Sequence, residues 1–155
     1  MEQMALDDSL IMVSAEDVMR GKYLTFYVGD NGFGLEISYV TEIIGIQNIT
    51  HVPYTHHYIK GIINLRGTVV PVMDMRLRFT LEEIPYTDRT CIVVINTEEI
   101  CIGLIVDEVS EVVDISDENI QPPPPTTSGG INNYIRAIAT VGENVKQLLD
   151  LEKIF

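Results

Sequence analysis

The amino-acid sequence predicts an all-β fold, and three observations support that prediction. Its apolar runs are short, rich in Ile and Val, and separated at even intervals by Gly, Pro, Asn and Asp, a pattern typical of strands and tight turns. The pattern of the first half recurs in the second half. Only short helical turns are expected besides the strands, so a barrel or a sandwich fits best.

The first strands are expected at the N-terminal side. Residues 22–29 alternate between apolar and polar side chains and predict a strand, with a turn over residues 30–32 and a return strand over residues 33–37. Residues 40–44 fit either a further strand or a short helix. A loop is expected over residues 47–57.

The most informative stretch is residues 58–79, YIKGIINLRGTVVPVMDMRLRF. Its two apolar runs predict a hairpin in which Gly67 suits a turn position with positive φ. Asp74 can cap a short helical turn over residues 75–79. Four of the ten Lys and Arg residues fall in this stretch, although the chain has a net charge of -13. This local excess of positive charge fits either a contact surface or a solvated face.

The second half repeats this organisation after a polar boundary at residues 80–89. Residues 90–96 and 100–106 predict a hairpin, residues 109–115 a strand, and residues 134–141 and 144–149 a last hairpin before a helical turn at 151–155. Residues 121–133, QPPPPTTSGGINN, predict a long loop.

An internal repeat relates the halves. Gly34 aligns with Gly103, and further on Asp74 aligns with Asp150. We therefore expect a flexible tail at 1–20 and a domain at 21–155, in which approximate halves 21–82 and 86–155 pack against each other. Arg66 has no counterpart in the shorter second turn. It either ties the halves together or meets a partner.

Composition argues against several classes of function. A net charge of -13 disfavours nucleic acid and anionic membranes as partners. The sequence has no apolar run of the roughly 20 residues that a membrane span requires and no secretory signal. A cytoplasmic location is therefore expected.

Enzymatic chemistry finds little support. His51, His56 and His57 lie close together, but adjacent histidines point apart and no Cys or carboxylate stands beside them at ligand spacing. We expect no metal, no cofactor and no catalytic residue. If Ile95 pairs with Ile100, Cys91 and Cys101 are neither opposite each other nor on one face. Both thiols are then expected to be reduced, buried and inert.

The chain resembles the bacterial chemotaxis coupling proteins of the CheW family from about residue 22 to residue 155. The motif that carries this resemblance consists of Gly61, Asn64, Leu65, Arg66, Gly67, Pro71 and Asp74. CIVVINTEEICIGLIVDEVSEVVDI and QPPP add to it. The resemblance implies two pseudo-symmetric SH3-like five-stranded β-barrels packed side by side, with short helical turns.

The resemblance also implies a non-enzymatic adaptor that couples chemoreceptors, the methyl-accepting chemotaxis proteins, to the histidine kinase CheA. One barrel would dock on the kinase's regulatory domain, and a groove between the barrels would take the cytoplasmic tip of the receptor. The protein would then be cytoplasmic and recruited to membrane receptor arrays, without inserting into the membrane.

Receptor contact is expected by resemblance at Val40, Glu42, Gly61 and Arg66, with Glu42 and Arg66 forming a linked pair. Lys60 and Arg78 are expected as rim contacts of an apolar groove. Glu42 aligns with Glu111 in the repeat, so it also fits a purely structural role.

Two alternatives stay open. The chain could serve a pilus-motility or other non-flagellar kinase array, or be a CheW-like domain of a larger protein, although termini within about 20 residues of the domain edges favour a stand-alone coupler. A small metal-dependent enzyme is the other alternative. The sequence does not identify the receptor or the pathway.

Overall fold

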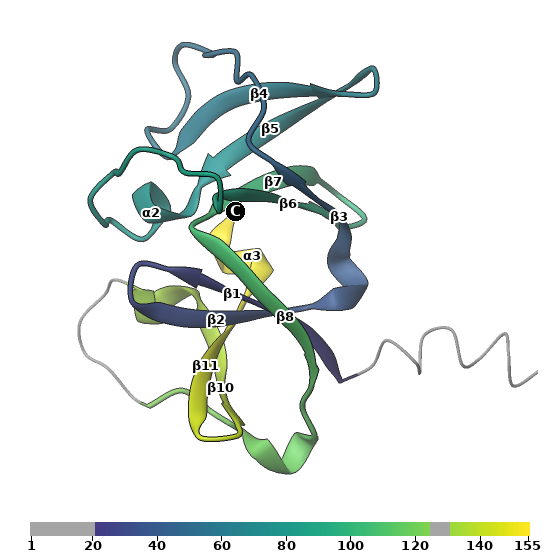
Figure 1. Cartoon of the computed structure of the whole chain (residues 1–155), viewed down its shortest axis with the longest axis vertical. Helices are drawn as coiled ribbons and strands as arrows, with labels where there is room; N and C mark the ends of the chain where they lie inside the picture. The colour runs from purple at the N-terminus through teal and green to yellow at the C-terminus, as the bar shows by residue number, and fades with distance from the viewer. Residues whose placement is uncertain (1–20, 125–130) are drawn as a thin grey trace, which may run out of the picture.

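The computed structural model describes residues 21–124 and 131–155, and its strands form two sheets (Figure 1). The prediction for the tail at 1–20 falls outside the described residues. One sheet has the order β8-β1-β2-β11-β10-β9, and the other has the order β3-β6-β7-β5-β4. They are the two predicted barrels, which we call the six-stranded and the five-stranded barrel. The sixth strand, β9, has only two residues.

The six-stranded barrel contains β1 (Lys22–Val28), β2 (Asn31–Glu36), β8 (Glu108–Asp114), β9 (Ile120–Gln121), β10 (Ile135–Val141) and β11 (Asn144–Leu149). The five-stranded barrel contains β3 (Val40–Gly45), β4 (Ile59–Leu65), β5 (Thr68–Asp74), β6 (Cys91–Asn96) and β7 (Cys101–Val106). Short helices are α2 (Met75–Arg78) and α3 (Leu151–Ile154), with 3-10 turns η1 (Ile37–Tyr39), η2 (Asp117–Asn119) and η3 (Ile131–Tyr134).

The two halves of the sequence are not the two barrels. The hairpin β1–β2 of the first half pairs with β8 and β11 of the second half. The hairpin β6–β7 of the second half pairs with β3 and β5 of the first half. The strand orders of the two sheets otherwise correspond under the repeat. The duplicated units have therefore exchanged hairpins, so halves 21–82 and 86–155 do not describe separate barrels.

The apolar core has three parts because β6, β7 and β1 bury both faces. Successive residues of a strand point to opposite sides, so Ile92 and Val94 fill the inside of the five-stranded barrel while Val93 and Ile95 face the space between the barrels. Tyr23 lies inside the six-stranded barrel. The largest cluster is the one between the barrels, which we call the inter-barrel core. The two barrels therefore share buried surface rather than merely touch.

The turns and caps refine the predictions. The first hairpin turns at Gly29 and Asp30, one residue earlier than expected, because Gly29 takes the positive φ of 63°. Residues 40–45 form a strand rather than a helix. The predicted caps of the helical turns are confirmed: the Asp74 carboxylate accepts hydrogen bonds from the Arg76 and Leu77 N–H groups of α2, and the Asp150 carboxylate accepts one from the Glu152 N–H of α3.

The cysteine hairpin has a different register from the predicted one. Ile95 pairs with Ile102 rather than with Ile100, and Cys101 pairs with Asn96. This shift of two residues keeps every side chain on its predicted face, so the cysteines still lie on opposite faces and both are free thiols. They are half-buried rather than buried, and burial raises the pKa of the Cys91 thiol. Within the described residues, no helix is long and apolar enough to cross a membrane.

Candidate protein-binding site

The ion pair between Arg66 and Glu42 closes one side of the five-stranded barrel. Arg66 sits at the tip of the β4–β5 hairpin with a φ of 51°, followed by Gly67 at 87°, and the Asn64 side chain accepts a hydrogen bond from the Gly67 N–H at 2.7 Å. This turn directs Arg66 towards β3, where its guanidinium donates to both carboxylate oxygens of Glu42. The predicted pair is therefore present.

The pair is exposed and carries charge at the surface. The Arg66 side chain is 72% exposed and that of Glu42 28%. The hydrogen bond from Arg66 holds the pKa of the Glu42 carboxyl below its ordinary value. Both groups are consequently charged at neutral pH, and the bidentate contact fixes the plane of the guanidinium.

Strand β3 adds an apolar component beside the pair. Val40 is half-buried and packs against the inter-barrel core, while Ile43 keeps 41% of its surface exposed. A bulge between Val40 and Glu42 shifts the register with β6. β3 is an edge strand of its sheet. Glu42 thus lies on, and Arg66 beside, an edge strand that leaves the apolar side chain of Ile43 exposed.

Gly61 belongs to the backbone of the fold. It is buried, has a φ of 150°, and a Cβ on it would lie 2.1 Å from the carbonyl oxygen of Thr50. Thr50 and Ile62 exchange two backbone hydrogen bonds of 2.9 Å across this position. Gly61 allows that close approach, and its surroundings explain its place in the motif without any partner.

The two predicted rim cations have different surroundings. Lys60 pairs with Glu83 of the linker between α2 and β6 and lies 6.0 Å from the centre of the Tyr86 ring. The Arg78 guanidinium lies between the rings of Tyr58 and Tyr134, 4.4 and 4.6 Å from their centres. Both cations are half-buried, but Lys60 pairs with a residue of the linker, whereas Arg78 is sandwiched between two aromatic rings.

Arg78 connects the two halves of the chain. Its Nε donates to the carbonyl oxygen of Ile154 at 2.7 Å, and its Nη1 donates to the Tyr134 hydroxyl at 2.9 Å. The groove-rim prediction did not anticipate these contacts, because a count of charges cannot distinguish a stacked guanidinium from a solvated one. Arg78 is a structural tie between α2 and α3.

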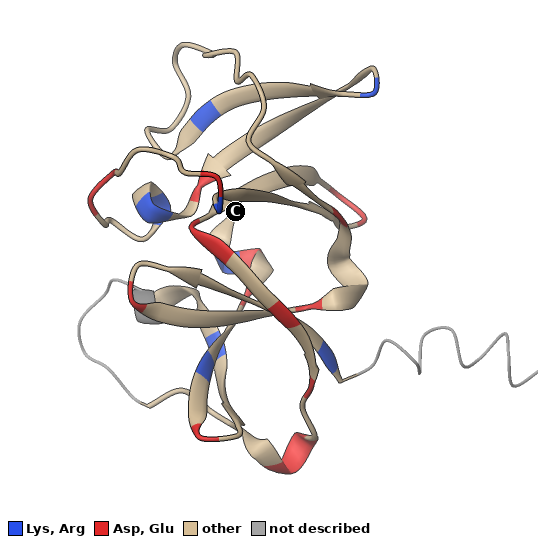
Figure 2. Ribbon diagram, in the orientation of Figure 1, with Lys and Arg blue, Asp and Glu red and all other residues tan. Residues whose placement is uncertain are grey.

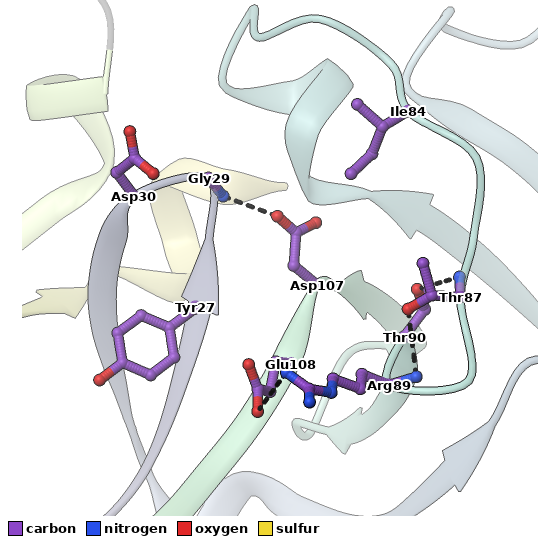
Figure 3. Close-up of a pocket in the computed structure, with 9 residues that line it drawn as sticks. All are labelled: Tyr27, Gly29, Asp30, Ile84, Thr87, Arg89, Thr90, Asp107 and Glu108. Carbon is purple, nitrogen blue, oxygen red and sulfur yellow. Dashed lines mark hydrogen bonds and ion pairs between the residues drawn. The ribbon is translucent and has the colours of Figure 1, made fainter.

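A second polar contact between the barrels was not predicted. Asp107, which follows β7, accepts hydrogen bonds from Arg76 Nε at 2.9 Å and from the Gly29 N–H at 2.8 Å. Figure 3 shows Asp107 pointing to the β1–β2 turn, beside a pocket that the linker residues Ile84 and Thr87 also line. In the repeat, Asp107 and Arg76 align with Ser38 and Glu152. Asp107 and Arg76 both differ from their aligned residues, as Arg66 does, so the same sequence signal would have identified this pair.

The three histidines lie on the exposed loop before β4. The His56 ring stacks on Tyr58 at 5.0 Å between ring centres, and His57 contacts the same ring edge-on. Residues 21–124 and 131–155 contain no group of three or more His, Cys, Asp or Glu side chains arranged to hold a metal ion. Acidic residues are distributed over both barrels (Figure 2).

Comparisons with known proteins agree on one family. The family profile described as CheW-like domain matches residues 22–155. The chain is 32% identical to the chemotaxis protein CheW of Klebsiella aerogenes over 90% of this chain and 84% of that protein. It is 31% identical to the chemotaxis protein CheW of Bacillus subtilis over 92% of this chain and 91% of that protein.

A solved structure supports the same conclusion. The scaffolding protein TtCheW from Thermoanaerobacter tengcongensis superposes with a TM-score of 0.80 at 32% identity, over 87% of this chain and 92% of that chain. Fold and sequence therefore agree along almost the whole chain.

Proposed function

The chain belongs to the CheW-like domain family and is a chemotaxis coupling adaptor, and from this premise we propose that it joins chemoreceptors to a CheA-type histidine kinase. It does so without catalysis, in the cytoplasm, as a member of receptor arrays at the membrane. Its partners are the kinase's regulatory domain and the cytoplasmic tip of the receptors.

The observation that carries the receptor site is the Glu42–Arg66 pair on the edge of an apolar strand. An exposed ion pair contributes little to folding, so its value lies in the surface that it presents. Val40 and Ile43 supply apolar contact, and the bidentate pair supplies a fixed polar border, as recognition of an amphipathic helix requires. Lys60, near the other end of β4 beside Glu83, is a separate candidate contact, while Gly61 supports the sheet from within.

The first experiment measures kinase binding and receptor coupling separately. Calorimetric titration with the regulatory domain of the cognate kinase should give micromolar or tighter binding. Arg66→Asp should fold normally and keep this binding, but lose receptor-dependent stimulation of the kinase by at least tenfold, because it places two carboxylates side by side. No binding of the wild-type chain to the kinase domain would remove the assigned function.

A matched control exists for this variant. The Arg89 side chain is 74% exposed and lies 3.9 Å from Glu108, so Arg89→Asp makes the same charge change on a comparably exposed arginine. It should leave coupling within twofold of wild type. Coupling that persists in Arg66→Asp, or that falls equally in both variants, would contradict a specific role of Arg66.

A charge swap distinguishes orientation from direct contact. Glu42→Arg combined with Arg66→Glu restores an ion pair of reversed polarity. If the pair only shapes the edge of β3, the double variant should recover coupling relative to Arg66→Asp. If the guanidinium contacts the receptor, coupling should stay as low as in Arg66→Asp.

A further inference from the structure

The hairpins β1–β2 and β6–β7 have the same length but occupy different barrels. They align in the internal repeat at one constant offset, which places Gly34 opposite Gly103. Each nevertheless completes the barrel whose closing hairpin comes from the other half: β1–β2 lies beside β11, and β6–β7 lies beside β5 (Figure 1). The chain therefore needs a feature that distinguishes one hairpin from the other.

Lys146 on β11 departs from the repeat at a buried position. It precedes Leu148 by two residues, so its side chain also points into the six-stranded barrel, and it is only 6% exposed. Its counterpart in the five-stranded barrel is Val70, which is 1% exposed. The cross-strand neighbour of Lys146 is Ala139, whereas that of Val70 is the larger Ile63. A smaller neighbour thus accompanies the longer side chain, as a packed interior requires.

The hairpin β1–β2 supplies the polar contact of the Lys146 ammonium. Its Nζ donates to the Tyr27 hydroxyl at 3.0 Å and lies 4.4 Å from the centre of the Tyr27 ring. Within the described part of the chain, Lys146 forms no ion pair with a carboxylate. A buried ammonium is costly unless hydrogen bonds replace its contacts with water, so the burial of Lys146 depends on this one tyrosine.

The same hairpin leaves the space that the lysine occupies. A Cβ on Gly32 would lie 2.9 Å from Nζ and 3.0 Å from Cδ of Lys146, and the lysine could make room only by leaving the Tyr27 hydroxyl. The hairpin β6–β7 carries Cys101 at the position of Gly32. It carries Asn96 at the position of Tyr27. In the six-stranded barrel it would therefore bring a side chain against the lysine and replace the aromatic ring by a shorter group.

We propose that Lys146 selects the hairpin of the six-stranded barrel: it admits β1–β2, excludes β6–β7, and so directs the exchange of hairpins between the two halves. Selection of this kind combines a favourable contact with the correct element and a clash with the wrong one. Tyr27 provides the contact, and a side chain at the position of Gly32 provides the clash. The inference stands apart from the proposed function, since it concerns folding and uses no residue of the Glu42–Arg66 site.

The full chain with a converted hairpin tests this selection. Tyr27→Asn with Gly32→Cys gives β1–β2 the two side chains of β6–β7 and should lower the urea midpoint, followed by circular dichroism, by at least about 0.5 M. Adding Lys146→Val, the residue of the other barrel, should restore at least half of that loss. In the unaltered hairpin, Lys146→Val should give no such gain. If the converted hairpin prevents folding, Lys146→Val should restore a cooperative transition, and failure to do so would overturn the proposal.

A matched lysine and a direct readout of strand pairing complete the test. The Lys153 side chain on α3 is 59% exposed, so Lys153→Val should shift the midpoint equally with either hairpin, whereas Lys146→Val should not. Equal effects of Lys146→Val in both backgrounds would refute selection by this residue. Backbone NOEs between β1 and β8, which pair from Lys22 and Asp114 onwards, report where the hairpin lies. A converted hairpin that keeps these NOEs and the wild-type midpoint beside Lys146 would show that the barrel does not discriminate.

Discussion

Individual residues of the family motif serve two different purposes in this molecule. Gly61 is buried against the Thr50 carbonyl, and Asn64 and Gly67 form the hairpin turn. Arg66 alone projects from that turn to pair with Glu42 and stays largely exposed. The motif is therefore not one contact surface. Gly61, Asn64 and Gly67 shape the backbone, and Arg66 is the side chain that this backbone exposes.

Substitution of Gly61 by alanine should destabilise the fold by about 2–4 kcal/mol, because a Cβ would collide with the Thr50 carbonyl oxygen at a φ that favours glycine. Urea unfolding followed by circular dichroism measures this loss. Gly45→Ala is the matched control, since no atom lies within 4 Å of its added Cβ, and it should change stability by less than about 0.5 kcal/mol. Wild-type stability of Gly61→Ala with lost receptor coupling would instead make Gly61 a contact residue.

At the scale of elements, the two short helices are capped alike but supported differently. Asp74 is 2% exposed and accepts hydrogen bonds from the Arg76 N–H at 2.9 Å and from the Tyr86 hydroxyl at 2.9 Å. Burial, followed by the charge of Asp74, raises the pKa of Tyr86. Asp150 is only half-buried and accepts from the Glu152 N–H at 3.1 Å. The repeat predicted the shared cap, but not this difference.

Removal of the two caps should therefore have unequal effects. Asp150→Ala loses a cap alone and should cost about 1 kcal/mol. Asp74→Ala also leaves the half-buried Tyr86 hydroxyl without its acceptor and should cost about 3 kcal/mol. Denaturant titration of both variants, with Tyr86→Phe as a third, measures the contrast. Equal losses for Asp74→Ala and Asp150→Ala would show that the Tyr86 contact contributes nothing.

Sequence patterns predicted local features well and pairings poorly, for a physical reason. Alternation of apolar residues has a period of two, so it identifies the strands and the faces of Cys91 and Cys101, yet it is unchanged when the register slips by two residues. Alternation also carries no information about which strands become neighbours. The Glu42–Arg66 pair was predictable only because the family resemblance implies that the two positions are linked, whereas the stacking of Arg78 depends on rings from both halves.

At the scale of the whole molecule, the exchanged hairpins make the two barrels interdependent. Each barrel takes one hairpin from one half of the sequence and its remaining strands from the other half. The inter-barrel core draws side chains from both, including Phe33, Met73 and Leu149. Removal of either half of the sequence would leave both barrels with incomplete sheets. We therefore expect the full chain to unfold in one cooperative transition.

This interdependence predicts the behaviour of the two halves as separate chains. A fragment of residues 21–82 keeps β1–β2 without β8 and β11, and keeps β3 without β6. It should be unfolded alone by circular dichroism and amide proton dispersion, as should residues 86–155. Mixed in equal amounts, the fragments should regain β structure, because each supplies the hairpin that completes the other's sheet. Cooperative unfolding of either fragment alone would show that a single repeat unit can close its own barrel, and that the exchange is not needed for folding.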